Sequence, residues 1–131
     1  MGFERFVSTR YSRTPLVTLG KTGYIMFNKA TADTYGLYEY PFAVRYYDPA
    51  ERRIAVQFTK RQAELGAVKV RRPCIDVPAK GFLERWKIPH IGKHGSAGLV
   101  VVQLTPNDGD DGPTLAIQLP PEVHDHDRPP A

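Results

Sequence analysis

Residues 25–30 read Ile-Met-Phe-Asn-Lys-Ala, and residues 75–80 read Ile-Asp-Val-Pro-Ala-Lys. Each stretch is a short apolar strand that runs into the start of a short helix. Each unit then leads to a hairpin whose last strand is nearly the same: Ile-Ala-Val-Gln-Phe at 54–58 and Leu-Ala-Ile-Gln-Leu at 115–119. The order β-α-β-β therefore occurs twice. Because one such unit cannot bury its apolar face alone, the pattern predicts an α+β, β-rich fold in which two pseudo-symmetric β-α-β-β repeats form one barrel-like domain with short helices.

The length of 131 residues suits a single hydrophobic core. We expect one barrel-like domain over residues 1–119, with repeat one at about 16–60 and repeat two at about 66–119. Residues 120–131 are polar and rich in proline, so we expect a disordered tail there. No apolar run approaches the ~20 residues that a membrane helix requires, which predicts a protein without a membrane partner.

Local signals place the individual elements. Asn28 is a favourable N-cap for a helix over 29–36, and Gly36 is a favourable residue for ending it. A second helix is predicted over 79–87. The closing hairpin is predicted to pair residues 99–103 with 115–119 around a loop at 107–112.

Alternation along the strands predicts the core. In the strand over 42–47, we expect Phe42, Val44 and Tyr46 to share one face, which leaves Arg45 outward beside Arg53. The residues expected to be buried together, from both repeats, are Phe27, Val44, Ile54, Val56, Val77, Leu83, Trp86, Val102, Leu115 and Ile117.

The chain has a single cysteine, Cys74, so it cannot form an intrachain disulfide. Absence of a disulfide framework favours a cytoplasmic location. Cys74 stands between a proline and an isoleucine at the start of a strand, where a small buried apolar side chain is the expected role.

Charge is distributed unevenly along the chain. Residues 1–93 carry 17 Lys or Arg and 8 Asp or Glu, a net charge of +9, whereas residues 94–131 carry one Arg and 6 acidic residues, a net charge of −5. A basic body with an acidic end is typical of proteins that bind polyanions. A solvated surface of mixed charge is the alternative explanation.

Residues 23–37 (Gly-Tyr-Ile-Met-Phe-Asn-Lys-Ala-Thr-Ala-Asp-Thr-Tyr-Gly-Leu), followed by 44–48 and 54–58, resemble the AbrB/SpoVT swapped-hairpin family. Asn28 stands where that family usually has a proline, and 35–37 stand for its Leu-Gly-Leu helix exit. Two copies in one chain resemble the tandem arrangement of MraZ-like members. The resemblance implies a transcription regulator or antitoxin that binds duplex DNA through basic residues, with a homodimer as a possible assembly.

Basic residues recur at corresponding places in the two copies. Arg45 and Arg53 are expected to be cross-strand neighbours, Lys69 and Arg71 to alternate outward next to Arg72, and the remaining lysines to lie at turns or helix starts. For each one alone, a solvated surface charge is the simpler explanation. The predicted nucleic-acid-binding residues are Lys21, Lys29, Arg45, Arg53, Lys69, Arg71, Arg72 and Lys80.

Two other functions stay open from the sequence. A single-stranded nucleic acid could stack on exposed aromatic side chains, for which the candidates are Tyr24, Tyr38, Tyr40 and Tyr47. Alternatively, the protein could be a non-catalytic interaction or assembly module that binds no nucleic acid.

Catalytic and metal-binding patterns are weak. His90 and His94 lie in a glycine-rich stretch, and His124 and His126 lie in the tail, so neither pair has a pre-organised setting for a metal. Serines lack a nucleophile-elbow motif, and no glycine-rich phosphate loop precedes a helix. We therefore expect no enzyme, no cofactor, no metal and no small-molecule substrate.

Overall fold

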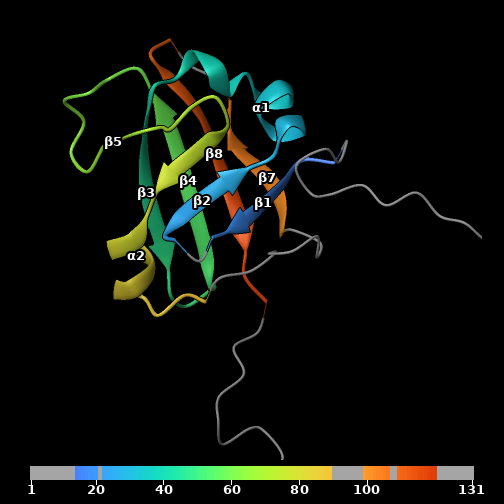
Figure 1. The fold of residues 1–131 in the computed structure, drawn as a ribbon, viewed down its shortest axis with the longest axis vertical. Coiled ribbons are helices and arrows are strands. Elements are labelled where there is room, and N and C mark those ends of the chain that lie inside the picture. The colour runs from blue at the N-terminus through green and yellow to red at the C-terminus, as the bar shows by residue number, and fades with distance from the viewer. Residues whose placement is uncertain (1–13, 21, 90–98, 107–108, 121–131) are drawn as a thin grey trace, which may run out of the picture.

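In the part of the chain that the structure describes, eight antiparallel strands form one sheet that curls into a nearly closed barrel (Figure 1). The computed structural model describes residues 14–20, 22–89, 99–106 and 109–120. The strands are β1 (Leu16–Leu19), β2 (Tyr24–Phe27), β3 (Phe42–Asp48), β4 (Arg53–Thr59), β5 (Val68–Lys69), β6 (Ile75–Pro78), β7 (Leu99–Thr105) and β8 (Asp111–Gln118). The prediction of a β-rich, barrel-like fold with short helices is confirmed.

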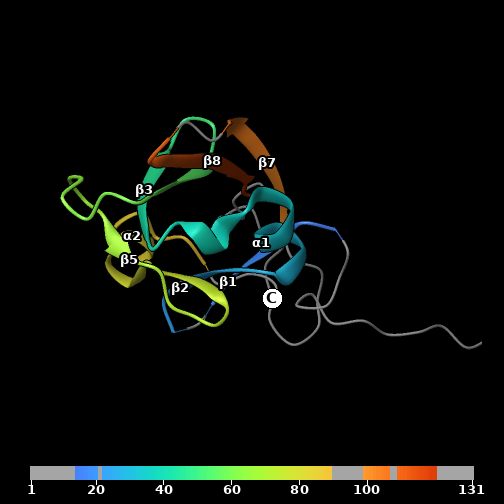
Figure 2. The same ribbon diagram turned by 90° about the horizontal axis from the view of Figure 1, so that it is seen from above.

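The sheet closes between β5 and β6, which stand at its two ends in the order β5-β3-β4-β8-β7-β1-β2-β6. Just beyond β5, the backbone N–H of Arg71 donates to the carbonyl of Asp76 at 2.8 Å, and the N–H of Asp76 donates back at 3.2 Å. Figure 2 shows the sheet from one end, as a ring crossed by α1 and the segment that follows it. This single bridge joins the two ends of the sheet.

The interior is filled by alternate residues from both halves of the chain. Ile54 lies opposite Ile117, Ile25 lies opposite Val77, and all four are fully buried. Most of the predicted core is therefore in place. The predicted core residues that lie in this core are Phe27, Ile54, Val56, Val77, Leu83, Leu115 and Ile117. Val44 is also buried, but it lies opposite Gln57 on the outer face of β3, the face that it shares with Tyr46, and is not part of this cluster.

Two further predicted core residues differ from the expectation. Trp86 is only partly buried, against the edge of the core. The prediction for Val102 is wrong: 55% of it is exposed, because Val101 is the residue that lies opposite Ile117 and points inward. Both alternating sets of the apolar run 99–104 could have formed a core face, and the register of β7 against β8 decides between them.

Two short helices occupy opposite ends of the barrel (Figure 1). Helix α1 (Lys29–Tyr35) begins at its N-cap Asn28 and ends at Gly36, whose φ of 64° is left-handed, as predicted. A 3-10 turn, η2 (Leu37–Glu39), follows it. Helix α2 (Lys80–Arg85) is shorter than the predicted 79–87, because its N-cap Ala79 offers no side-chain hydrogen bond and Lys87 has a positive φ of 54°.

The Asn28 side chain also ties α1 to β1. Its Oδ1 accepts from the backbone N–H of Thr31 at 3.0 Å and from that of Leu16 at 3.1 Å, and its Nδ2 donates to the carbonyl of Thr14 at 2.8 Å. A proline at this position could make none of these side-chain bonds. The residue that departs from the resembled family pattern therefore has a structural role of its own.

Candidate nucleic-acid interface

Three predicted cationic residues lie together where the barrel closes. Lys69 belongs to β5, Arg71 makes the bridge to β6, and Arg72 follows it. All three are exposed, while the intervening Val70 is buried. Lys69 and Arg71 therefore alternate outward as predicted, and we call Lys69, Arg71 and Arg72 the basic seam.

Each arginine of the seam is held beside a tyrosine. The guanidinium carbon of Arg71 lies 5.0 Å from the centroid of the Tyr24 ring, across the closure of the barrel. Hydrogen bonding by the Tyr24 side chain raises the pKa of Arg71 above its ordinary value. The Arg72 Nη2 atom donates to the carbonyl oxygen of Tyr38 at 2.6 Å. The first contact holds the Arg71 guanidinium over an aromatic ring, and the second ties the Arg72 guanidinium to the backbone of the segment that carries Tyr38, while both arginines stay exposed.

A hollow of about 180 Å³ opens next to the seam. Its floor consists of the buried side chains Phe27, Ala32 and Ile75, and its walls include Tyr38 and Cys74. Sequence patterns could not locate this hollow, because residues 27–38 and 73–75 meet only through the pairing of β2 with β6. Cys74 was expected to be buried, and its partial exposure is explained by this position at the wall.

Lys29 stands at the edge of the same hollow. Its Nζ donates to Asp33 Oδ2 at 2.6 Å, one helical turn away, and this hydrogen bond raises the pKa of Lys29 above its ordinary value. Both side chains are exposed, so the pair is a weak one that solvent screens. Lys29 therefore stays protonated, and the carboxylate of Asp33 partly offsets its positive charge.

The prediction that Arg45 and Arg53 are outward neighbours is wrong. Arg45 lies opposite Val56 on the inner face of β3, whereas Arg53 lies opposite Asp48 on the outer face of β4. Arg45 Nη1 donates to the carbonyl of Pro78 at 2.9 Å, its guanidinium carbon lies 5.8 Å from the Phe82 ring centroid, and burial lowers its pKa. Arg45 is a packing residue under α2.

The two remaining predicted lysines have different outcomes. Lys80 is exposed at the first position of α2, and its backbone packs against Gly23, the residue before Tyr24. It lines a second hollow, of about 220 Å³, together with Glu84 and Lys87. Lys21 lies outside the described residues.

The four candidate stacking tyrosines differ in exposure and in their distance from the seam. Tyr38 is 44% exposed and Tyr24 is half-buried, both at the seam. Tyr40 is buried, and the ring of Tyr47 packs 5.2 Å from that of Trp86. Only the first two lie where a ligand held by the basic seam could reach them.

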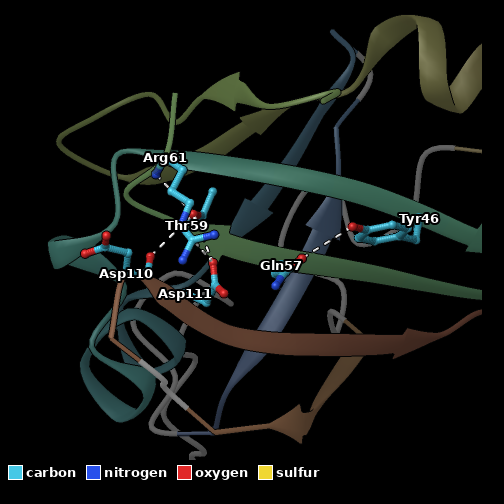
Figure 3. Close-up of polar contacts among 6 residues, drawn as sticks. All are labelled: Tyr46, Gln57, Thr59, Arg61, Asp110 and Asp111. Atoms are coloured by element: carbon cyan, nitrogen blue, oxygen red, sulfur yellow. Dashed lines mark hydrogen bonds and ion pairs between the residues drawn. The ribbon is translucent and has the colours of Figure 1, made fainter. Parts of the chain in front are cut away.

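At the far end of β4 one basic residue lies near an acidic one. Arg61 Nε lies 3.9 Å from Asp111 Oδ1, and Thr59 Oγ1 donates to the backbone carbonyl of Asp110 at 3.3 Å (Figure 3). The Asp111 carboxylate is thus the acidic group that lies beside Arg61 and Thr59. Lys60 and Arg61 are both exposed; Arg61 has a long ion pair with Asp111, and Lys60 Nζ lies 5.8 Å from the centroid of the Tyr40 ring.

The outer face of the sheet carries an exposed apolar patch. Val100, Val102 and Leu104 point outward from β7 and are 61%, 55% and 48% exposed. Tyr46, 48% exposed, lies on the same outer face of β3, and its hydroxyl donates to Gln57 Oε1 at 3.3 Å (Figure 3). We call these four residues the outer apolar face.

Among the described residues, no group of three His, Cys, Asp or Glu side chains is placed to hold a metal ion. The four histidines all lie outside the described ranges. No helix in the described part of the chain has the length and apolarity needed to cross a membrane.

Comparison with known proteins gives no match to this chain, whether with protein-family models, curated proteins or solved structures. The resemblance to the AbrB/SpoVT family stays a prediction.

Proposed function

We propose that the protein binds nucleic acid through the basic seam. The observation that carries the proposal is the grouping of Lys69, Arg71 and Arg72 on one outward surface, with the Tyr24 ring against the Arg71 guanidinium and the backbone carbonyl of Tyr38 bonded to Arg72. Phosphates require clustered cations, and bases offer planar faces to aromatic rings. The seam supplies the cations, and Tyr24 and Tyr38, which Arg71 and Arg72 contact, supply the rings.

The arrangement favours a single strand over a duplex. In a duplex the base faces are stacked on one another, so exposed aromatic side chains gain little from it. In a single strand each base can stack on a ring while its phosphate meets a cation. Duplex DNA binding with a regulatory role, as implied by the AbrB/SpoVT resemblance, is the competing form of the proposal.

We also propose that the barrel is a pseudo-twofold repeat of two β-β-α-β-β units. The β5–β6 bridge closes the strands into a ring. If β1 is exchanged with β5, β2 with β6, β3 with β7 and β4 with β8, every strand keeps the same neighbours and the order around the ring is the same, read in the opposite direction. Antiparallel pairs of equivalent strands, β2 with β6 and β4 with β8, meet on opposite sides of the barrel. Both observations support the repeat seen in the sequence.

Fluorescence anisotropy with labelled oligonucleotides at low salt tests the binding proposal. We expect saturable binding that the double variant Lys69→Ala/Arg71→Ala weakens. The matched control is Lys60→Ala/Arg61→Ala, which removes the same charge from two exposed residues outside the seam and should bind as the parent protein does. Competition of single-stranded against duplex oligonucleotide decides between the two forms. Absence of binding, or equal losses in both double variants, would refute the seam as the site.

An interaction module is the second candidate, and the outer apolar face favours it. Exposed apolar residues that share one face are typical of protein–protein contact surfaces. Val102→Glu should then abolish association, which sedimentation of the purified protein would detect. Equal sedimentation of parent and variant, both monomeric, would rule out self-association through this face.

A further inference from the structure

The hollow beside the basic seam has the properties of a pocket for one flat ring. Its volume is about 180 Å³, and a cavity of about 150 Å³ is known to admit a benzene-sized molecule. Pockets for drug-sized ligands or cofactors start near 300 Å³. The hollow is therefore large enough for a single base and too small for a complete nucleotide cofactor.

The lining suits the two faces of such a ring. Phe27, Ala32 and Ile75 give an apolar floor, and the exposed Tyr38 stands at the wall. An apolar floor with an aromatic wall favours a planar group that leaves water. The carbonyl of Tyr38 also accepts the hydrogen bond from Arg72, so the ring and one cation of the seam share an anchor.

Two cationic residues stand near the mouth of the hollow, as a nucleic-acid backbone requires, and one of them is paired with an acid. Arg72 immediately precedes Pro73, a lining residue, and Lys29, which is paired with Asp33, lines the hollow from α1. A strand whose phosphates meet the seam would thus pass the mouth of the hollow with its bases free to turn inward.

The polar atoms of Asn28, another lining residue, are engaged in holding α1 and β1. Its Oδ1 accepts from Thr31 and Leu16, and its Nδ2 donates to Thr14. It therefore has little capacity to read the edge of a base. Recognition in the hollow would depend on shape and stacking rather than on base identity.

We propose that this hollow takes one unstacked base of a single strand whose phosphates lie on the basic seam. The inference rests on the proposed nucleic-acid function and adds a specific base-binding site to it. It differs from simple phosphate binding because it requires the base itself.

The test compares oligothymidylate with an abasic oligonucleotide of the same length, measured by fluorescence anisotropy. Oligothymidylate should bind about 5- to 150-fold more tightly, the range that corresponds to stacking of one base. Tyr38→Ala should remove most of this preference and leave the affinity for the abasic strand unchanged. The control is Tyr46→Ala, which removes a tyrosine of similar exposure from the outer apolar face and should change neither affinity.

A second variant guards against a folding defect in Tyr38→Ala. Cys74→Phe places a ring in the hollow and leaves the three seam residues unchanged, and it should reproduce the loss of preference. If both strands bind equally and neither variant alters their ratio, the base pocket is refuted while the nucleic-acid function stands. If neither strand binds at low salt, the proposed function itself fails. If Tyr38→Ala weakens both strands equally, the tyrosine serves the surface as a whole and the pocket is again refuted.

Discussion

Arg71 and Tyr24 face each other across the closure of the barrel, with the guanidinium carbon 5.0 Å from the ring centroid. The same arginine forms the backbone bridge to Asp76 that joins the last two strands of the ring. One residue thus connects the closure of the fold to the surface that we propose as the binding site. The two roles use different atoms, since the backbone closes the sheet and the side chain faces solvent.

Truncating a core residue and an outward residue of the closing hairpin should have very different effects. Ile117→Ala should lower the free energy of unfolding by ~2–5 kcal/mol, because the side chain is fully buried opposite Ile54. Val102→Ala should change it by no more than ~0.5 kcal/mol, because Val102 points outward from the neighbouring strand. Urea denaturation of both variants measures the difference. Equal losses would contradict the register of β7 against β8.

Two glycines near α2 provide a second matched pair. Gly23 has a φ of 92°, and a Cβ atom on it would lie 2.6 Å from the Cβ of Lys80. Gly23→Ala should therefore lower the free energy of unfolding by at least ~1–3 kcal/mol. Gly81, within α2, has no atom within 4 Å of its added Cβ, so Gly81→Ala should raise stability by ~0.5–1 kcal/mol. Thermal melts of the two variants should move in opposite directions, and a loss in both would refute this account of α2.

Arg45 and Arg53 carry the same charge on adjacent strands but face opposite sides of the sheet. Arg45→Ala should cost ~1.5–3 kcal/mol of unfolding free energy, since it removes a charged hydrogen bond to the carbonyl of Pro78. Arg53→Ala should change stability by less than ~0.5 kcal/mol, because its side chain is exposed. Chemical denaturation checks both values. A larger loss for Arg53 would mean that the faces of the β3–β4 hairpin are exchanged.

Residues with a single strong preference were well predicted from the sequence. Asn28 and Gly36 define the ends of α1, because each supplies a backbone requirement that few residues meet. Strands with one apolar face, such as β4, also had their inward residues identified correctly. Where both faces of a strand were apolar, as around Arg45 and Val102, alternation gave two equivalent solutions, and only the pairing with a distant strand selects one.

The candidate site was predicted only in part, for a related reason. Lys69, Arg71 and Arg72 are close in sequence, so their proximity could be anticipated. The contacts of Arg72 with Tyr38 and of Arg71 with Tyr24 join residues far apart in the chain, and no local pattern encodes them. The hollow next to them arises from the same long-range pairing.

The salt dependence of binding gives the last prediction. The logarithm of the affinity falls with the logarithm of salt concentration, with a slope of about 0.7 for each phosphate contact on a single strand and about 0.9 on a duplex. Lys69→Ala/Arg71→Ala should therefore reduce the magnitude of the slope by about 1.4 on a single strand, or about 1.8 on a duplex, if both side chains meet phosphates. Lys60→Ala/Arg61→Ala alters net charge equally but leaves the seam intact, so its slope should match that of the parent protein. Titrations from low to moderate salt measure all three slopes. Parallel lines for the parent and the seam variant would show that Lys69 and Arg71 make no phosphate contacts, whatever the affinity.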